Sequence, residues 1–194
     1  MLHICCAPDA TVPWRTLADE GLNVTGFFYG NNIHPIEEWE RRRDAVIKLA
    51  GIYGMNVTTA EYNSGEWFDE TALLADEPEG GKRCAECFRL QLSAAAKFAA
   101  RCGASYLCTT LTISPRKNPS LINETGRAVC ESLGIGIKWM PRIWRKNDGF
   151  KASAALSKSF GLYRQNYCGC EYSVREAPVK SPKGDFAVWE RRAG

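Results

Sequence analysis

The chain has 194 residues, of which 45% are hydrophobic and 24% charged, with a formal net charge of +3. This is the composition of one ordinary globular domain, and no apolar run approaches the roughly 18 residues that a membrane span needs. The N-terminus runs directly into a strand-like segment without the basic region of a signal peptide, so we expect a cytoplasmic protein. We predict a single domain over residues 1–194, in which residues 176–194 can form a loosely attached C-terminal tail.

Strand-like apolar runs alternate with segments of helical periodicity along most of the chain. The expected strands are Leu2–Cys5, Val24–Tyr29, Val57–Ala60, Tyr106–Thr110 and Ile135–Pro141. The expected helices run from Thr11 to Gly21, from about Ile36 onward, from Cys84 to Arg101, from Asn118 to Gly134 and from Gly149 to Phe160. This alternation predicts an α/β fold, in which helices cover both faces of a parallel sheet.

In open sheets of this type, ligands bind beyond the carboxyl ends of the strands, at the point where the strand order reverses. The loop after the first strand usually lies there. In this chain that loop carries Cys5, Cys6 and Asp9. The sequence therefore predicts a functional site at this edge of the sheet.

Six of the nine cysteines form three close pairs: Cys5 with Cys6, Cys84 with Cys87, and Cys168 with Cys170. In a reducing cytosol such pairs indicate metal or redox chemistry, whereas disulfides remain an alternative because intracellular proteins of hyperthermophiles contain them. The other three cysteines (Cys102, Cys108 and Cys130) are expected to behave as small hydrophobic residues.

The number of thiols discriminates between metals. A structural zinc takes four ligands and a cubane cluster takes three or four thiolates, so six thiols exceed either need. One cluster plus a second metal, with Asp9 as an oxygen ligand, uses the surplus. Two zinc sites would need about eight ligands, and the only histidines are His3 and His34. The residues leave open which thiols serve which metal.

Positive charge is concentrated in one part of the chain. Residues 1–114 hold 10 Lys/Arg against 15 Asp/Glu, whereas residues 115–164 hold 10 against 3. Such a stretch is typical of a phosphate-facing surface, although a solvated basic face without a partner is the alternative. Residues 41–43 (Arg-Arg-Arg) form a competing basic patch, which we expect mostly on the outer side of their helix.

Three motifs in this order resemble the QueH-type epoxyqueuosine reductases: residues 3–9 (HICCAPD), 83–89 (RCAECFR) and 167–170 (YCGC). The resemblance extends over nearly the whole chain, including Thr109 to Asn118. It implies an adenine-nucleotide-hydrolase-like fold of the HUP or Rossmann-like type. It also implies the last step of queuosine synthesis, in which an epoxide on the modified wobble base of a tRNA is reduced to an alkene with iron and without cobalamin.

The implied cofactors are a 4Fe-4S cluster and an additional mononuclear metal, iron, held by the six paired cysteines with Asp9. Reduction of the epoxide needs an external electron donor such as ferredoxin or flavodoxin. We expect Asp9 and Tyr106 to be catalytic, Tyr106 as a proton donor. The residues expected to contact tRNA are Arg116, Lys117, Arg142, Arg145 and Lys146. Trp139 and Trp144 lie among them as candidates for stacking on bases, although core packing is the favoured role for Trp139.

Two other functions remain open at this stage. A zinc-stabilised RNA-binding module without catalysis explains the basic stretch but leaves two thiols unused. A cluster-dependent tRNA thiolase shares the expected fold, but it needs a nucleotide-activating loop after the first strand. This chain has Cys-Cys-Ala-Pro-Asp at that place, so we do not expect ATP use.

Overall fold

A computed structural model describes residues 1–175, so the expected tail at 176–194 lies outside the described residues. The strands are β1 (Leu2–Ile4), β2 (Gly26–Phe28), β3 (Val57–Thr59), β4 (Tyr106–Thr109) and β5 (Lys138–Trp139). The helices are α1 (Ala7–Asp19), α2 (Ile36–Tyr53), α3 (Gly65–Thr71), α4 (Lys82–Arg101), α5 (Pro119–Leu133), α6 (Gly149–Ser159) and α7 (Glu171–Arg175). Two short 3-10 helices, η1 (Ala72–Leu74) and η2 (Leu111–Ile113), precede α4 and α5.

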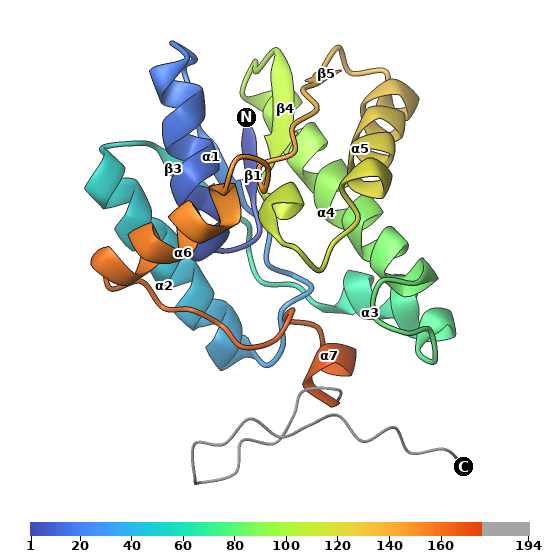
Figure 1. Cartoon of the computed structure of the whole chain (residues 1–194). Helices are drawn as coiled ribbons and strands as arrows, with labels where there is room; N and C mark the ends of the chain where they lie inside the picture. Colours follow the sequence, from blue (N-terminus) through green and yellow to red (C-terminus); the bar gives the residue numbers. More distant parts are fainter. Residues whose placement is uncertain (176–194) are drawn as a thin grey trace, which may run out of the picture.

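The five strands form one parallel sheet in the order β3-β2-β1-β4-β5. The chain first builds outward from β1 to β3 and then crosses over to β4, so the strand order reverses between β1 and β4. Helices α1, α2 and α6 lie on one side of the sheet and α4 and α5 on the other (Figure 1). The predicted α/β fold is confirmed.

Each face of the sheet has its own apolar core. Trp14, Phe28 and Leu49 belong to the core beneath α1 and α2, whereas Leu92 and Ile122 belong to the core beneath α4 and α5. The three inner strands are almost completely buried because helices cover both faces of the sheet, whereas the edge strands β3 and β5 are partly exposed. Over residues 1–175, no helix combines the length and the hydropathy needed to cross a bilayer.

Helix α1 begins at Ala7, four residues before the predicted start at Thr11. Cys6 is extended and occupies the N-cap position, and Pro8 lies in the first turn, where its missing N–H has no consequence. The hydroxyl of Thr11 donates to the carbonyl of Pro8 inside this turn and does not cap the helix. Because the helix starts early, Asp9 lies in its first turn, beside the two cysteines. Helices α3 and α7 were not predicted.

Candidate metal centre

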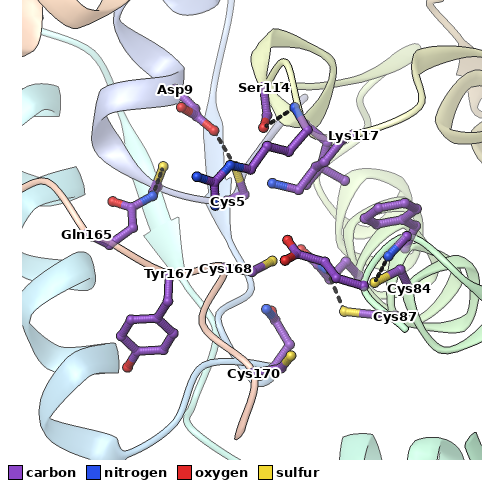
Figure 2. A pocket seen from close by; sticks show the side chains of 18 of the residues that line it. Cys5, Asp9, Cys84, Cys87, Ser114, Lys117, Gln165, Tyr167, Cys168 and Cys170 are labelled. Carbon is purple, nitrogen blue, oxygen red and sulfur yellow. Dashed lines mark hydrogen bonds between the residues drawn. The ribbon is translucent and has the colours of Figure 1, made fainter. Parts of the chain in front are cut away.

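A pocket of about 410 Å³ lies beyond the carboxyl ends of β1 and β4, where the strand order reverses. Its walls come from segments far apart in the sequence: the start of α1, the start of α4, the loop before α5 and the segment before α7 (Figure 2). The structure brings all seven predicted metal ligands to this pocket: Cys5, Cys6, Asp9, Cys84, Cys87, Cys168 and Cys170. Neither histidine lines it.

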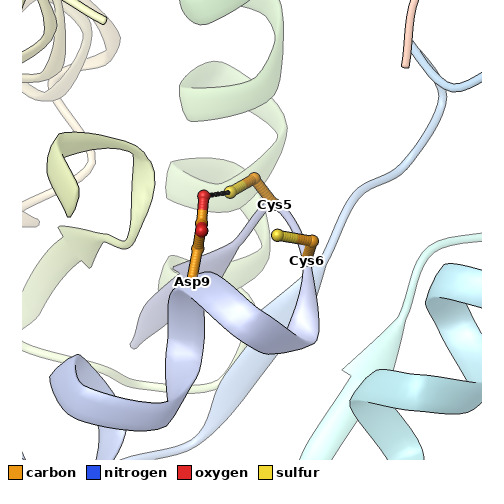
Figure 3. A group of neighbouring side chains, drawn as sticks. All are labelled: Cys5, Cys6 and Asp9. Carbon is orange, nitrogen blue, oxygen red and sulfur yellow. Dashed lines mark hydrogen bonds between the residues drawn. The ribbon is translucent and has the colours of Figure 1, made fainter. Parts of the chain in front are cut away.

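Cys5, Cys6 and Asp9 form a compact group at the start of α1 (Figure 3). One ligand atom from each lies within 4.8 Å of the others, and Cys5 Sγ is 3.5 Å from Asp9 Oδ2. A hydrogen bond from Cys6 lowers the pKa of the Cys5 thiol, whereas that bond and burial raise the pKa of Cys6. Three acidic groups this close repel one another when ionised, and a bound cation removes the repulsion.

Cys84, Cys87, Cys168 and Cys170 form a second group in the pocket, in which Cys168 lies between Cys5 and the two cysteines of α4 (Figure 2). Burial raises the pKa of Cys84 and of Cys87, and it raises that of Cys168 to about 11. The charges of the other three thiols raise the pKa of Cys87 further. Cys87 and Cys170 are buried and Cys84 and Cys168 are half-buried. Four thiols gathered in this way are a ligand set whose thiolate forms a bound metal centre would stabilise.

The N-terminus of α4 presents Cys84 and Cys87, as the sequence predicted. The helix begins at Lys82, so both thiols lie in its first two turns, near the positive end of the helix dipole. The backbone N–H of Gly80, just before the helix, donates to Cys84 Sγ at 3.2 Å. This arrangement stabilises negative charge on sulfur.

Arg42 holds the segment that carries Cys168 and Cys170. Its guanidinium donates to the carbonyl of Cys168 at 2.7 Å and to that of Tyr167 at 3.2 Å. The expectation that residues 41–43 lie mostly outside is wrong for Arg42, which is only 2% exposed. Gly169 has φ +129, and a Cβ at this position would lie 2.8 Å from Arg42 Nη1. Glycine is therefore required where this segment passes the guanidinium.

Lys117 reaches into the pocket from the loop before α5 (Figure 2). Burial by itself lowers the pKa of this amine, but attraction to Cys168, Cys5 and Asp9 outweighs it, so the pKa of Lys117 is raised. Lys117 thus interacts with residues of both groups of candidate ligands. Its ammonium group places a positive charge where the thiols converge.

The basic residues expected to contact nucleic acid do not form one surface. Arg116 and Lys117 line the pocket, whereas Arg142 and Lys146 line a separate cavity beside α1. Arg142 forms an ion pair with Glu20 at 2.6 Å. Only the first two basic residues therefore face the predicted site.

Arg145 has a different position again. Its Nη1 donates to three backbone carbonyls in the loop of residues 114–117, at 3.0–3.3 Å. A guanidinium bonded in this way braces the loop through Nη1, while the three N–H donors of Nε and Nη2 are not used in these bonds. Arg145 thus stabilises the loop that carries Arg116 and Lys117.

The two tryptophans proposed for base stacking are packed inside the protein. Trp144 is 8% exposed, and its indole N–H donates to the carbonyl of Thr109 at 2.9 Å. The indole of Trp139 donates to Asn123 and leaves no space for a Cβ at Gly126. Trp144 is therefore part of the core, whereas Trp139 is half-buried and packs against the core beneath α4 and α5.

The structure does not bring Tyr106 to the pocket. It is the first residue of β4 and is 44% exposed, at the amino edge of the parallel sheet. The cysteines lie beyond the opposite edge, so the strand separates the phenol from the site. This placement contradicts the prediction that Tyr106 is a catalytic proton donor.

The remaining cysteines lie outside the pocket, and all nine cysteines are free thiols. Cys108 is 3% exposed, and burial raises its pKa to about 12. Cys130 is also buried, with its pKa raised to about 11. These two residues behave as small apolar side chains, as predicted, whereas Cys102 is exposed at the end of α4.

Several residues of the site carry no motif in the sequence. Gln91, Trp67 and Gln165 contact the cysteines, and Phe150 and Arg164 line the pocket mouth. Gln91 follows Cys87 by one helical turn, a spacing that the sequence shows. The other four come from elements whose approach to the cysteines depends on the fold.

Comparisons with known proteins show the family to which this chain belongs. The family model described as Epoxyqueuosine reductase QueH matches residues 1–176. A protein of that name from Thermotoga maritima is 37% identical over 183 residues, covering 93% of this chain and 92% of the relative. One from Haemophilus influenzae is 34% identical over 177 residues, covering 91% of this chain and 72% of the relative. The chain therefore belongs to the epoxyqueuosine reductase QueH family.

Proposed function

We propose that this chain reduces epoxyqueuosine in tRNA to queuosine at the cysteine pocket, in the cytoplasm. The observation that carries the proposal is the convergence of six thiols and a carboxylate on one pocket at the switch point of the sheet. Removal of the epoxide oxygen takes two electrons and two protons and releases water. This demand for electrons explains why a substrate pocket is lined with metal ligands.

We further propose that Cys84, Cys87, Cys168 and Cys170 hold a 4Fe-4S cluster. Four thiolates around one zinc ion lie about 3.8 Å apart, given tetrahedral Zn–S bonds of about 2.3 Å. Among residues 1–175, the one group of three ligand atoms within 4.8 Å of one another is Cys5, Cys6 and Asp9. The wider spacing of the other four thiols favours a centre with a separate iron for each thiolate.

We assign Cys5, Cys6 and Asp9 to the mononuclear metal, iron. Two thiolates and one carboxylate leave coordination positions open, which a catalytic metal requires. When bound, the cluster would pass electrons singly from an external donor such as ferredoxin or flavodoxin, and the second metal would act as a Lewis acid toward the epoxide. Lys117 supplies positive charge to the same space.

The tRNA is proposed to approach the mouth of this pocket. Arg116 and Arg164 are exposed there, and the Arg164 guanidinium lies 5.7 Å from the ring centroid of Phe150. Such a pair offers a cation to phosphate and a flat surface to a base. Arg142 and Lys146, on their separate cavity, can contact only a more distant part of the tRNA.

The test is turnover of tRNA that contains epoxyqueuosine by anaerobically reconstituted full-length protein with a chemical reductant. We expect queuosine in the product, together with iron and sulfide in the amounts of one cluster plus one further iron. Cys84→Ser should abolish turnover, whereas Cys102→Ser, an exposed control, should retain it. Zinc as the only bound metal, with no turnover, would show that the proposal is wrong.

A further inference from the structure

Three of the six paired cysteines accept N–H···S hydrogen bonds. The side-chain amides of Gln91 and Gln165 donate to Cys87 at 3.1 Å and to Cys6 at 2.9 Å, and the Gly80 N–H donates to Cys84. These are the only two glutamines in the chain. Both are thus used as donors to sulfur at the pocket.

Two N–H donors from different elements lie at Cys87, and one of them forms a hydrogen bond to its sulfur. Gln91 lies one turn further along α4 and is 3% exposed. Trp67, on α3, is completely buried, and its indole N–H has no hydrogen-bond partner among the described residues. It packs in one cluster with Cys87 and lowers the pKa of that thiol. A buried indole N–H without a partner costs free energy, and an ionised sulfur beside it would supply the acceptor.

These donors suit a metal-bound sulfur better than a free thiol. A thiolate bound to a metal has no proton and can only accept, so the amide of Gln91 must present its N–H to it. Hydrogen bonds to a charged acceptor are the strong ones, and a buried site has little water to compete with them. Each electron that a cluster takes up increases the negative charge on its sulfurs.

We propose that Gln91 and Trp67 are positioning residues that raise the reduction potential of the cluster through N–H···S hydrogen bonds to Cys87. The inference rests on the proposed function, because it requires a cluster on the second group of cysteines. Donors that stabilise the extra negative charge favour the reduced form. The cluster then accepts electrons from a weaker external reductant than it otherwise could.

The experiment compares Gln91→Met and Trp67→Phe with wild type in the full-length, anaerobically reconstituted protein. Both changes remove an N–H donor and keep most of the side-chain volume. Leu92→Met is the matched control, because Leu92 is buried on the same helix but packs in the core beneath α4 and α5. Iron and sulfide content, the melting temperature and the midpoint potential from a mediated dithionite titration are measured.

We expect a more negative midpoint potential in each variant, a larger shift in the double variant, and the wild-type value in Leu92→Met. An unchanged potential at full iron and sulfide content would overturn the inference and leave the proposed function intact. A wild-type protein that binds no cluster would overturn both. A variant that loses its cluster but melts like Leu92→Met supports positioning of Cys87, whereas joint loss of cluster and fold indicates packing alone.

Discussion

The guanidinium of Arg42 lies 2.7 Å from the carboxylate of Glu38, and their side chains are only 2% and 5% exposed. The same guanidinium donates to the carbonyl of Cys168, and Tyr163 donates its hydroxyl to Glu38. This ion pair connects α2 to the segment that carries two of the candidate cluster ligands. Its geometry therefore links the stability of the fold to the position of the metal ligands.

Arg42→Met should destabilise the protein by about 3–5 kcal/mol, because it leaves the buried Glu38 carboxylate without its partner. Arg42→Met combined with Glu38→Met should be less destabilised than Arg42→Met alone, since no buried charge is then uncompensated. Anaerobic urea unfolding measures both. Arg15→Met removes an exposed ion pair with Asp19 and should change the free energy of unfolding by less than about 1 kcal/mol. Equal effects of Arg42→Met and Arg15→Met would refute the assigned role.

Gly169→Ala should lower the iron and sulfide content of the reconstituted protein. The added Cβ would collide with Arg42, and φ +129 is unfavourable for any L side chain. Gly54→Ala is the control, because Gly54 also has a positive φ but open space around its Cα. It should cost about 1 kcal/mol in stability and leave the metal content unchanged. Normal metal content in Gly169→Ala would show that this contact does not position the cysteines.

Asp9→Ala should remove about one iron per chain and preserve the sulfide of the cluster. The carboxylate belongs to the compact group with Cys5 and Cys6, which does not include the other four thiols. Iron and sulfide analysis with Mössbauer spectroscopy separates the two kinds of iron. Asp19→Ala, a change on the exposed end of α1, serves as the control. Loss of sulfide together with iron in Asp9→Ala would place Asp9 at the cluster instead.

Iodoacetamide at pH 8 should modify Cys102 in the folded protein and spare Cys108. Cys102 is exposed, whereas Cys108 is 3% exposed with its pKa raised to about 12. At pH 8 the Cys108 thiol is protonated and does not act as a nucleophile. Peptide mass spectrometry before and after unfolding in urea measures the difference. Modification of Cys108 before unfolding would show that β4 opens in the native state.

Arg116→Glu should weaken tRNA binding and reduce the slope of log K against log salt by about one or more, as expected for loss of a phosphate contact. Arg116 is exposed at the mouth of the pocket. Lys97→Glu makes the same charge change on an exposed residue in the C-terminal half of α4, away from the cysteines at the other end of that helix. Filter binding over a range of salt concentrations compares the two. If both variants lose affinity equally, the tRNA does not approach as proposed.

The sequence by itself determined the order of the elements and the edge of the sheet at which the site lies. These features depend on local rules, such as the capping of α5 by Asn118 and the left-handed Gly134 at its end. Cys5 and Cys6 directly follow the first strand, and Cys84 and Cys87 begin a helix, so their convergence followed from parallel topology. The short helix α3 was not predicted from the sequence. Its Trp67 packs beside Cys87, so one residue next to the site was missed with it.

Only the tertiary structure decided which of the candidate ligands lie together and which charged side chains accompany them. Cys84 and Cys168 are far apart in the sequence, so their proximity depends on how the segment before α7 packs against α2. A run of three arginines is typical of a surface, yet Arg42 is buried, where it bonds to the Glu38 carboxylate and to the carbonyls of residues 167–168. Lys117 lines the pocket beside the thiols, whereas Tyr106 lies at the amino edge of the sheet. Sequence spacing fixes the element of each side chain, but packing and charge fix its direction.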